Sequence, residues 1–237
     1  MHKIRHIVEP ERLLLTWQDP VSRRRFVVGA LRRDKAGVCF RYLEGEELEQ
    51  ARKHGFKGYL AFRNMKAVYR LGVMESFMTR LPPRSREDFG KFLEYWNIDP
   101  EAEISDFALL GYTGAALPRD GFRFLPVFAR DVEAVPLTIE VAGHRYAGQS
   151  VTVGETVAFR HEPGNAADPE AVAVYAGEGK GMRHIGYVMR GLNAQFVSWL
   201  KSGSIHGRVV RINGSSERPV VLAWVEFHRR LQGHIAT

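Results

Sequence analysis

The second half of the chain contains side chains that can hold both the phosphates and the bases of a nucleic acid. Arg145, Arg160 and Arg190 can each pair with phosphate oxygens through a guanidinium group. Tyr146 and Tyr187 can each offer a flat ring for stacking or a hydroxyl group for hydrogen bonding. On strand-like segments, however, tyrosines more often pack in a half-buried sheet, and an arginine near a helix start more often faces water. These residues therefore predict a nucleic-acid contact surface, with packing and a solvated surface as the alternatives.

The titratable residues do not indicate an enzyme. His144, His161 and His184 lack the spacing of a metal-binding motif. Cys39 is the only cysteine, so it has no partner for an internal disulfide and no neighbours for a zinc site. No nucleophile is paired with a base at a recognisable spacing. We therefore predict no catalytic residues, no metal, no cofactor and a non-enzymatic function.

The overall composition favours an anionic partner. The 237 residues include 34 lysines and arginines and 27 aspartates and glutamates, giving a net charge of +7 and an isoelectric point near 9.7. Such a basic balance favours nucleic acid but does not prove it. Apolar residues make up 45% of the chain, enough for a folded core, yet no apolar run is long enough to span a membrane. With a single cysteine and no secretion signal, we expect a cytoplasmic protein without membrane contact.

A charged segment that ends in proline, residues 129–136, separates two differently patterned regions. We therefore predict two domains, at residues 1–133 and 134–237. The first is expected to be α+β. Strand-like alternation occurs in four of its segments, 12–17, 25–31, 37–42 and 122–128. Apolar residues at helical spacing predict helices near 85–97 and 104–110.

The second region predicts a mostly β, OB-like small barrel with one helix. Short β-rich runs separated by turn residues occur at 137–142, 156–160, 171–175, 185–188, 209–212 and 220–227. The helix is expected at 192–201, where Ser202 and Gly203 end an apolar stripe. A closed or nearly closed barrel fits this pattern, with the helix at its open end.

An ordered set of short motifs in this second region resembles the HIRAN domain. The motifs are Gly143-His144-Arg145-Tyr146, then Phe159-Arg160-His161-Glu162-Pro163-Gly164-Asn165-Ala166-Ala167-Asp168-Pro169-Glu170-Ala171-Val172-Ala173-Val174, and finally His184-Ile185-Gly186-Tyr187. The resemblance covers about residues 137–212. It implies an OB-like barrel that binds single-stranded DNA, with recognition of a free 3′ end.

The resemblance also assigns ligand contacts. It places Arg145, Tyr146, Asn165, Asp168, Tyr187 and Arg190 at positions associated with ligand binding. A carboxylate such as Asp168 accepts a hydrogen bond from a 3′ hydroxyl but repels a further phosphate, so end selectivity is expected from charge. Asn165 and Asp168 are equally suited to hydrogen-bonding the backbone of their own loop. HIRAN domains that bind DNA often carry aromatic residues where this chain has Ala147 and Ala167, so a smaller stacking surface is expected.

The first region resembles the N-terminal subdomain of the HipA toxin kinases across most of residues 12–128. The features that carry this resemblance are Val28-Gly29-Ala30-Leu31, Phe40-Arg41-Tyr42, Phe77-Met78-Thr79-Arg80-Leu81-Pro82, Leu109-Leu110-Gly111 with Gly114-Ala115-Ala116-Leu117, and Phe124-Leu125-Pro126. It implies a protein-interaction platform, because no kinase body follows. The expected function is single-stranded DNA capture, in a process such as DNA repair. The alternative is an antitoxin-like or scaffold protein that acts through the first domain without binding DNA ends.

Overall fold

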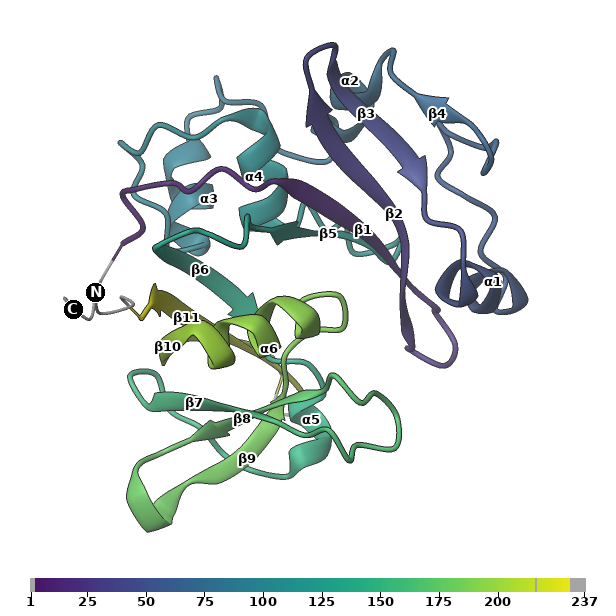
Figure 1. The fold of residues 1–237 in the computed structure, drawn as a ribbon. Helices are drawn as coiled ribbons and strands as arrows, with labels where there is room; N and C mark the ends of the chain where they lie inside the picture. Colours follow the sequence, from purple (N-terminus) through teal and green to yellow (C-terminus); the bar gives the residue numbers. More distant parts are fainter. Residues whose placement is uncertain (1–2, 216, 231–237) are drawn as a thin grey trace, which may run out of the picture. The chain divides into compact units, whose positions relative to one another are not determined.

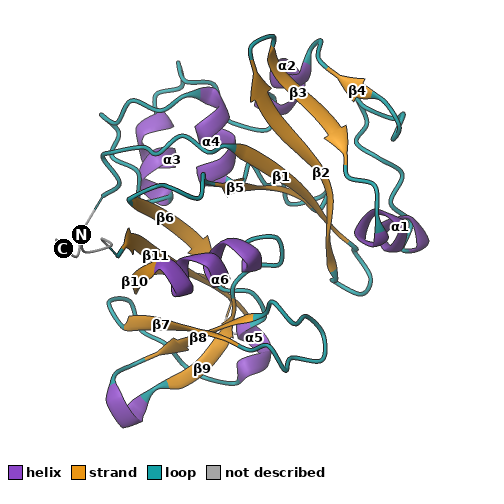
Figure 2. Cartoon of the chain, in the orientation of Figure 1, coloured by secondary structure: helices purple, strands orange, loops and turns teal. Residues whose placement is uncertain are grey.

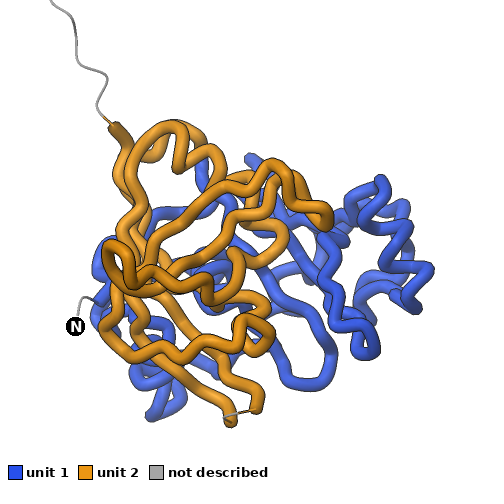
Figure 3. The backbone as a smooth tube through the Cα atoms, turned by 90° about the horizontal axis from the view of Figure 1, so that it is seen from below, with its two compact units in different colours: residues 1–129 blue, residues 130–237 orange. Residues whose placement is uncertain are grey.

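The computed structural model describes residues 3–215 and 217–230 and divides the chain into two compact units. Unit 1 is Met1–Ala129 and unit 2 is Arg130–Thr237 (Figure 3). In the described residues, no helix is long and apolar enough to cross a membrane.

Unit 1 contains one antiparallel sheet with short helices beside it (Figures 1 and 2). Its strands are β1 (Arg12–Gln18), β2 (Arg25–Asp34), β3 (Gly37–Tyr42), β4 (Val68–Tyr69) and β5 (Phe122–Val127), in the order β4-β3-β2-β1-β5. Its helices are α1 (Glu46–Lys53), α2 (Val73–Met78), α3 (Phe89–Tyr95) and α4 (Asp106–Thr113). The interior residues of β1 are all buried, as expected for a strand with neighbours on both sides.

The core of unit 1 is rich in aromatic rings. Phe77 packs against Phe40, Phe62 and Phe124, with ring centroids 5.4, 5.2 and 4.9 Å away. Such edge-to-face and tilted pairs add to the stability gained by burying the rings. Helix α4 lies on β1 and β5, and its Gly111 approaches Leu13 too closely for a larger side chain. This packing positions the loops between the helices and the sheet.

Unit 2 is built on a second antiparallel sheet (Figure 1). Its strands are β6 (Ala134–Glu140), β7 (Thr156–His161), β8 (Val172–Ala176), β9 (Arg183–Tyr187), β10 (Gly203–Ser215) and β11 (Arg218–Arg229), in the order β6-β11-β10-β7-β8-β9. The helical elements are α5 (His144–Ala147), the 3₁₀ turn η1 (Gly179–Gly181) and α6 (Asn193–Ser202). The mostly β character of this region agrees with the sequence, but two short helical elements join the single helix that was expected.

The sheet of unit 2 is not a closed barrel, which corrects the expected OB-like closure. Among the described residues, strands β6 and β9 remain edge strands. They are linked by one residue pair just beyond β6, where Ala142 and Tyr187 exchange two backbone hydrogen bonds of 2.8 and 2.9 Å. The barrel stays open because β6 ends at Glu140 and the chain then turns into α5 rather than continuing along β9.

Helix α6 packs on one face of the unit 2 sheet. Phe196 contacts Phe159 of β7, and Trp199 stacks on Phe227 of β11 at 4.9 Å. Both helix residues are almost completely buried. Because side chains alternate between the two faces of a strand, residues next to Phe159 along β7 point away from α6. This opposite face, and the end of the sheet where β7 meets β8, carry the predicted site residues.

Candidate nucleic-acid interface

The loop between β7 and β8, residues 162–171, is held by its own polar side chains. The Asn165 Oδ1 atom accepts hydrogen bonds from the backbone N–H groups of Ala167 and Asp168, at 3.0 and 3.3 Å. The Asp168 Oδ1 atom accepts one from the Glu170 N–H at 2.9 Å. Asn165 and Asp168 therefore have the local structural role that the sequence allowed as the alternative to ligand contact.

Asn165 and Asp168 also belong to a polar network that reaches neighbouring elements. The Glu162 Oε2 atom accepts hydrogen bonds from the Tyr187 hydroxyl and the Asn165 amide, both at 3.2 Å. The Asp168 Oδ2 atom accepts one from the side-chain amide of Asn193, at the start of α6, at 2.8 Å. We call these five residues, Glu162, Asn165, Asp168, Tyr187 and Asn193, the loop cluster. It brings two carboxylates to one end of the sheet.

Two members of the loop cluster have unusual environments. Burial, together with the neighbouring Glu162 carboxylate, raises the pKa of the Tyr187 phenol, so the hydroxyl stays protonated and donates to Glu162. Asn193 is only 6% exposed, and its Oδ1 atom has no hydrogen-bond partner among the described residues. A buried acceptor without a donor is uncommon in folded proteins.

Arg145 and Tyr146 lie on α5, which corrects the strand-like setting expected for Tyr146. Gly143 and Gly148 flank this single turn with positive φ values of 74° and 62°, which glycine adopts without strain. His144 anchors the turn, because it is buried and its Nδ1 atom lies 2.8 Å from the Ile185 carbonyl oxygen. Tyr146 is 75% exposed as a result.

The exposed pair on α5 is arranged as a cation over a ring. The Arg145 guanidinium lies 4.4 Å from the centre of the Tyr146 ring and donates a hydrogen bond to its hydroxyl. Within the described residues, no hydrogen bond or ion pair joins Arg145 to the carboxylate of Asp168. The pair thus keeps most of its guanidinium donors and one ring available to a ligand.

A short backbone path connects α5 to the loop cluster. Ala142, two residues before α5, pairs with Tyr187, whose hydroxyl bonds Glu162. Gly186 makes this approach possible, since a Cβ atom there would lie 2.4 Å from the Ala142 carbonyl oxygen and its φ is +140°. Figure 1 shows α5 and the β7–β8 loop at the same end of unit 2.

The two remaining predicted arginines lie outside the loop cluster. Arg160 is exposed on β7, with its guanidinium 5.2 Å from the centre of the Tyr175 ring. Arg190 is partly exposed in the turn between β9 and α6, three residues before Asn193. The structure therefore groups Asn165, Asp168 and Tyr187 and places the four other residues on α5, on β7 and in the turn before α6.

Sequence reasoning assigned no ligand contact to four residues of this region. Glu162 and Asn193 complete the loop cluster, and Tyr175 and His184 lie beside Arg160 and Tyr187 on the open face of the sheet. Glu162 and His184 belong to the motifs that carry the HIRAN resemblance. Asn193 gave no signal, because an asparagine near a helix start is usually a local cap.

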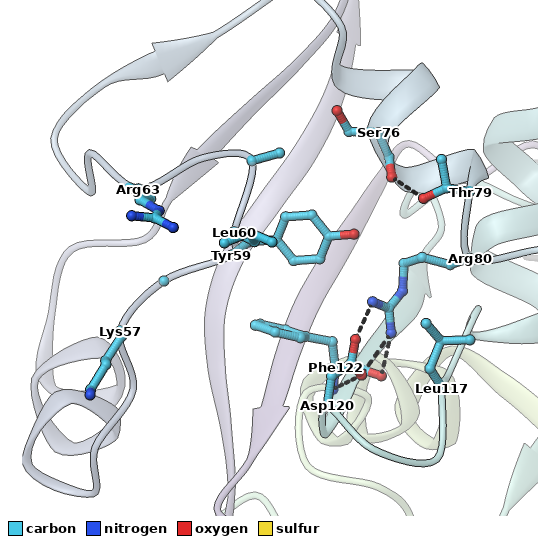
Figure 4. Close-up of a pocket in the computed structure, with 12 residues that line it drawn as sticks. Lys57, Tyr59, Leu60, Arg63, Ser76, Thr79, Arg80, Leu117, Asp120 and Phe122 are labelled. Carbon is cyan, nitrogen blue, oxygen red and sulfur yellow. Dashed lines mark hydrogen bonds and ion pairs between the residues drawn. The ribbon is translucent and has the colours of Figure 1, made fainter.

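The described residues contain no group of three or more histidine, cysteine, aspartate or glutamate side chains that could hold a metal ion. They do contain a second candidate region, a pocket of about 960 Å³ in unit 1 (Figure 4). Tyr59 and Phe122 form its aromatic floor, and Leu60 and Leu117 are exposed at its edge. Arg80 and Asp120 form an ion pair inside it.

Comparison with known proteins identifies the second unit. Residues 136–227 match the family model of the HIRAN domain, which is less than half of the chain. Among curated proteins, none matches the chain. The match does not reach residues 12–128, so the resemblance of that segment to the HipA subdomain is not supported by it and stays a prediction.

Three solved structures are similar. The crystal structure of the HIRAN domain of human HLTF has 22% identity and a TM-score of 0.34, covering 42% of this chain and 82% of that one. A Lactobacillus plantarum protein has 24% identity and a TM-score of 0.32, covering 40% and 97%. The NMR structure of the HLTF HIRAN domain in its DNA-bound conformation has 22% identity and a TM-score of 0.32, covering 40% and 76%.

Proposed function

We propose that residues 136–227, which form a HIRAN domain, bind single-stranded DNA at its 3′ end without cleaving it. Support comes from the family match and from the HLTF HIRAN domain, a member of the same family whose structure is described in a DNA-bound conformation. The observation that carries the proposal is the loop cluster, which brings two carboxylates to one end of the sheet, together with the exposed Arg145–Tyr146 pair on α5.

The arginines around the cluster supply the affinity. Arg145, Arg160 and Arg190 bind phosphates, because a protein that neutralises phosphates releases counterions from the strand. Tyr146 offers an exposed face to a base, with the Arg145 guanidinium already over that ring. These contacts do not depend on base identity, so we expect weak sequence preference and strong salt dependence.

The carboxylates supply the preference for an end. Glu162 and Asp168 both have oxygen lone pairs beyond the hydrogen bonds they already accept, so a terminal 3′ hydroxyl can donate to either. A continuing phosphodiester would instead place a negative charge next to two carboxylates.

The test compares labelled oligonucleotides that carry either a 3′ hydroxyl or a 3′ phosphate, at two salt concentrations. We expect wild-type protein to bind the 3′ hydroxyl form at least about tenfold more tightly, and the double variant Glu162→Gln, Asp168→Asn to lose most of this preference. Asp131→Asn, which removes an exposed carboxylate elsewhere in unit 2, is the matched control. Equal binding of both oligonucleotides by the wild type would refute end recognition, and cleavage of either strand with magnesium or manganese would refute the non-enzymatic role.

A second proposal concerns unit 1, which we infer to be a protein-interaction platform. The pocket supports it, because Leu60 is 76% exposed and Leu117 is 42% exposed at the edge of the aromatic floor. Lys57 and Arg63 line the same pocket, so the complementary partner segment combines an apolar side chain with an acidic one. A partner recovered by wild-type protein and by Arg145→Ala, but lost with Leu60→Asp, is the expected result. A partner retained by Leu60→Asp would rule out this surface.

A further inference from the structure

Three aromatic rings form a continuous row on the face of the unit 2 sheet that points away from α6. The ring of Tyr187 lies 4.8 Å from that of His184, which lies 5.5 Å from that of Tyr175. The Arg160 guanidinium lies 5.2 Å from the centre of the Tyr175 ring. We call Tyr187, His184 and Tyr175 the ring row. All three residues are partly exposed, and the neighbouring rings meet edge to face.

Strand register explains why these rings share one face. Tyr175 of β8 pairs with His184 of β9, and Ala173 pairs with Tyr187, so each pair lies on one side of the sheet. His184 and Tyr187 are three residues apart and would point to opposite faces of a regular strand. The register shift in β9 inserts Ile185 as an extra residue, which returns Tyr187 to the face of His184.

Cations lie along the same face. Arg160 makes no hydrogen bond or ion pair in the part of the chain that the structure describes, so all its N–H donors remain available. Arg208 of β10 pairs with Thr156 of β7, and Thr156 lies on the same side of β7 as Arg160. Arg208 is also exposed. Two unpaired guanidinium groups therefore accompany the ring row.

We propose that the ring row carries the nucleotides that precede the 3′ terminal nucleotide of a bound single strand. This inference rests on the proposed function, because the row begins at Tyr187, a member of the loop cluster. From there the strand runs along β9 toward His184 and Tyr175, with its phosphates on Arg160 and Arg208. Open sheet faces with aromatic rings stack about two to three bases in other single-strand binders.

The chemistry of the row favours an unpaired strand over other polyanions. Stacking on rings requires bases whose faces are free, and a duplex hides those faces within its own stack. An acidic protein segment would satisfy the arginines but leave the three rings without partners. The row also provides the additional stacking area that is missing where Ala147 and Ala167 replace aromatic residues.

The test measures affinity as a function of strand length. Wild type, Tyr175→Leu and His184→Leu are titrated with a trinucleotide and a decanucleotide that end in the same three nucleotides and a 3′ hydroxyl. Leucine keeps apolar packing and removes the flat ring. We expect each variant to lose about tenfold in affinity for the decanucleotide and less than twofold for the trinucleotide. Tyr95→Ala, a tyrosine of unit 1 with 37% exposure, serves as the control and should change neither affinity.

A second readout places the bases directly. A fluorescent 2-aminopurine at the fourth position from the 3′ end should be quenched by wild-type protein and much less by Tyr175→Leu. Equal affinities of wild type and variants for the decanucleotide, or equal losses for both lengths, would overturn the ring row. Failure of the proposed function looks different, because wild-type protein would then show no preference for a 3′ hydroxyl whatever the strand length.

Discussion

Both units contain arginines that lie over aromatic rings, yet the two settings differ in burial and in hydrogen bonding. In unit 1, Arg80 is buried and lies near the rings of Tyr59 and Phe122, at 5.7 and 5.8 Å from their centres. Its donors bond the Asp120 carboxylate and the carbonyl oxygen of Ala115. In unit 2, Arg160 lies over Tyr175 at a similar distance but is exposed and bonds no acid.

This difference shows that the contact between an arginine and a ring does not by itself indicate a role. Where the guanidinium is buried and most of its N–H donors are bonded within the fold, losing its acidic partner is costly. Where the ring only supports one side of the guanidinium, the donors point outward and can bind a phosphate. Variants of the two arginines, and of the backbone near them, distinguish these two roles.

Removal of the acid beside the buried arginine should cost the most. Asp120→Ala leaves the Arg80 guanidinium buried without its ionic partner, so we expect the free energy of unfolding of unit 1 to fall by about 3 kcal/mol. Urea denaturation measures this free energy of unfolding. Arg160→Ala is the comparison, and it should change the free energy of unfolding by less than about 0.5 kcal/mol. Equal losses of unfolding free energy in Asp120→Ala and Arg160→Ala would show that the two arginines do not differ in their contribution to stability.

In unit 2, the position of Tyr187 depends on its backbone pairing with Ala142 rather than on an ion pair. Gly186→Ala should therefore lower the free energy of unfolding of unit 2 by about 2 kcal/mol, because the new Cβ meets the Ala142 carbonyl oxygen at a positive φ. Gly179→Ala is matched to it, since Gly179 also has a positive φ but nothing lies within 4 Å of its Cβ position. Thermal melts of both variants separate the close contact from the backbone strain, and similar losses would exclude a special role for the Ala142–Tyr187 link.

Arg160 should affect binding rather than stability. We expect Arg160→Ala to weaken decanucleotide binding about tenfold and to reduce the slope of log affinity against log salt by about 0.7, the share of one phosphate contact. Arg160→Lys should keep the slope while losing part of the affinity, because lysine retains the charge without the planar group. Arg63→Ala removes an exposed arginine of unit 1 and should leave both quantities unchanged. An unchanged slope of log affinity against log salt in Arg160→Ala would rule out a phosphate contact by Arg160.

Tyr187 joins the ring row to the loop cluster, and its hydroxyl should contribute less to the free energy of unfolding than the groups above. Tyr187→Phe removes the hydrogen bond to Glu162, so we expect a loss of about 1 kcal/mol in the free energy of unfolding at neutral pH. The pKa of Tyr187 is raised by burial and by Glu162, so its neutral phenol stabilises the fold below about pH 10, and this contribution disappears as the pH rises further. Urea titrations from pH 8 to 11 should show a shallower decline for the variant than for wild type. A parallel decline would mean that Tyr187 ionises equally in the folded and unfolded chains.

Alternating apolar residues were a good guide to most strands, because side-chain period reflects the buried face directly. Residues 12–17 lie in β1 and residues 156–160 in β7, as predicted. The pattern failed at α5, where a helix of one turn is too short to show any period and is set by the two glycines beside it. It also failed at closure of the barrel, because a strand pattern carries no information on where the edges of a sheet meet.

The candidate site was predicted only in part, because sequence motifs report local features and not which elements pack together. Asn165, Asp168 and Tyr187 stand in recognisable motifs, and the structure brings them together. Asn193 and Tyr175 join the site only because α6 and β8 pack beside it, and such proximity depends on tertiary structure. The bulge at Ile185 sets the direction of Tyr187; Gly186 beside it is the kind of residue that indicates a bulge, but the register of the bulge follows only from strand pairing.

The open seam of the unit 2 sheet has a consequence for solubility. Unpaired strand edges invite other chains to add strands, which leads to aggregation. On one side of the seam, β6 contains Pro136, which has no backbone N–H to offer an incoming strand. On the other side, β9 carries the charged Arg183 and an irregular backbone at Ile185. Each edge thus has its own obstacle to self-association, and the domain can stay monomeric while one end of its sheet remains accessible to a ligand.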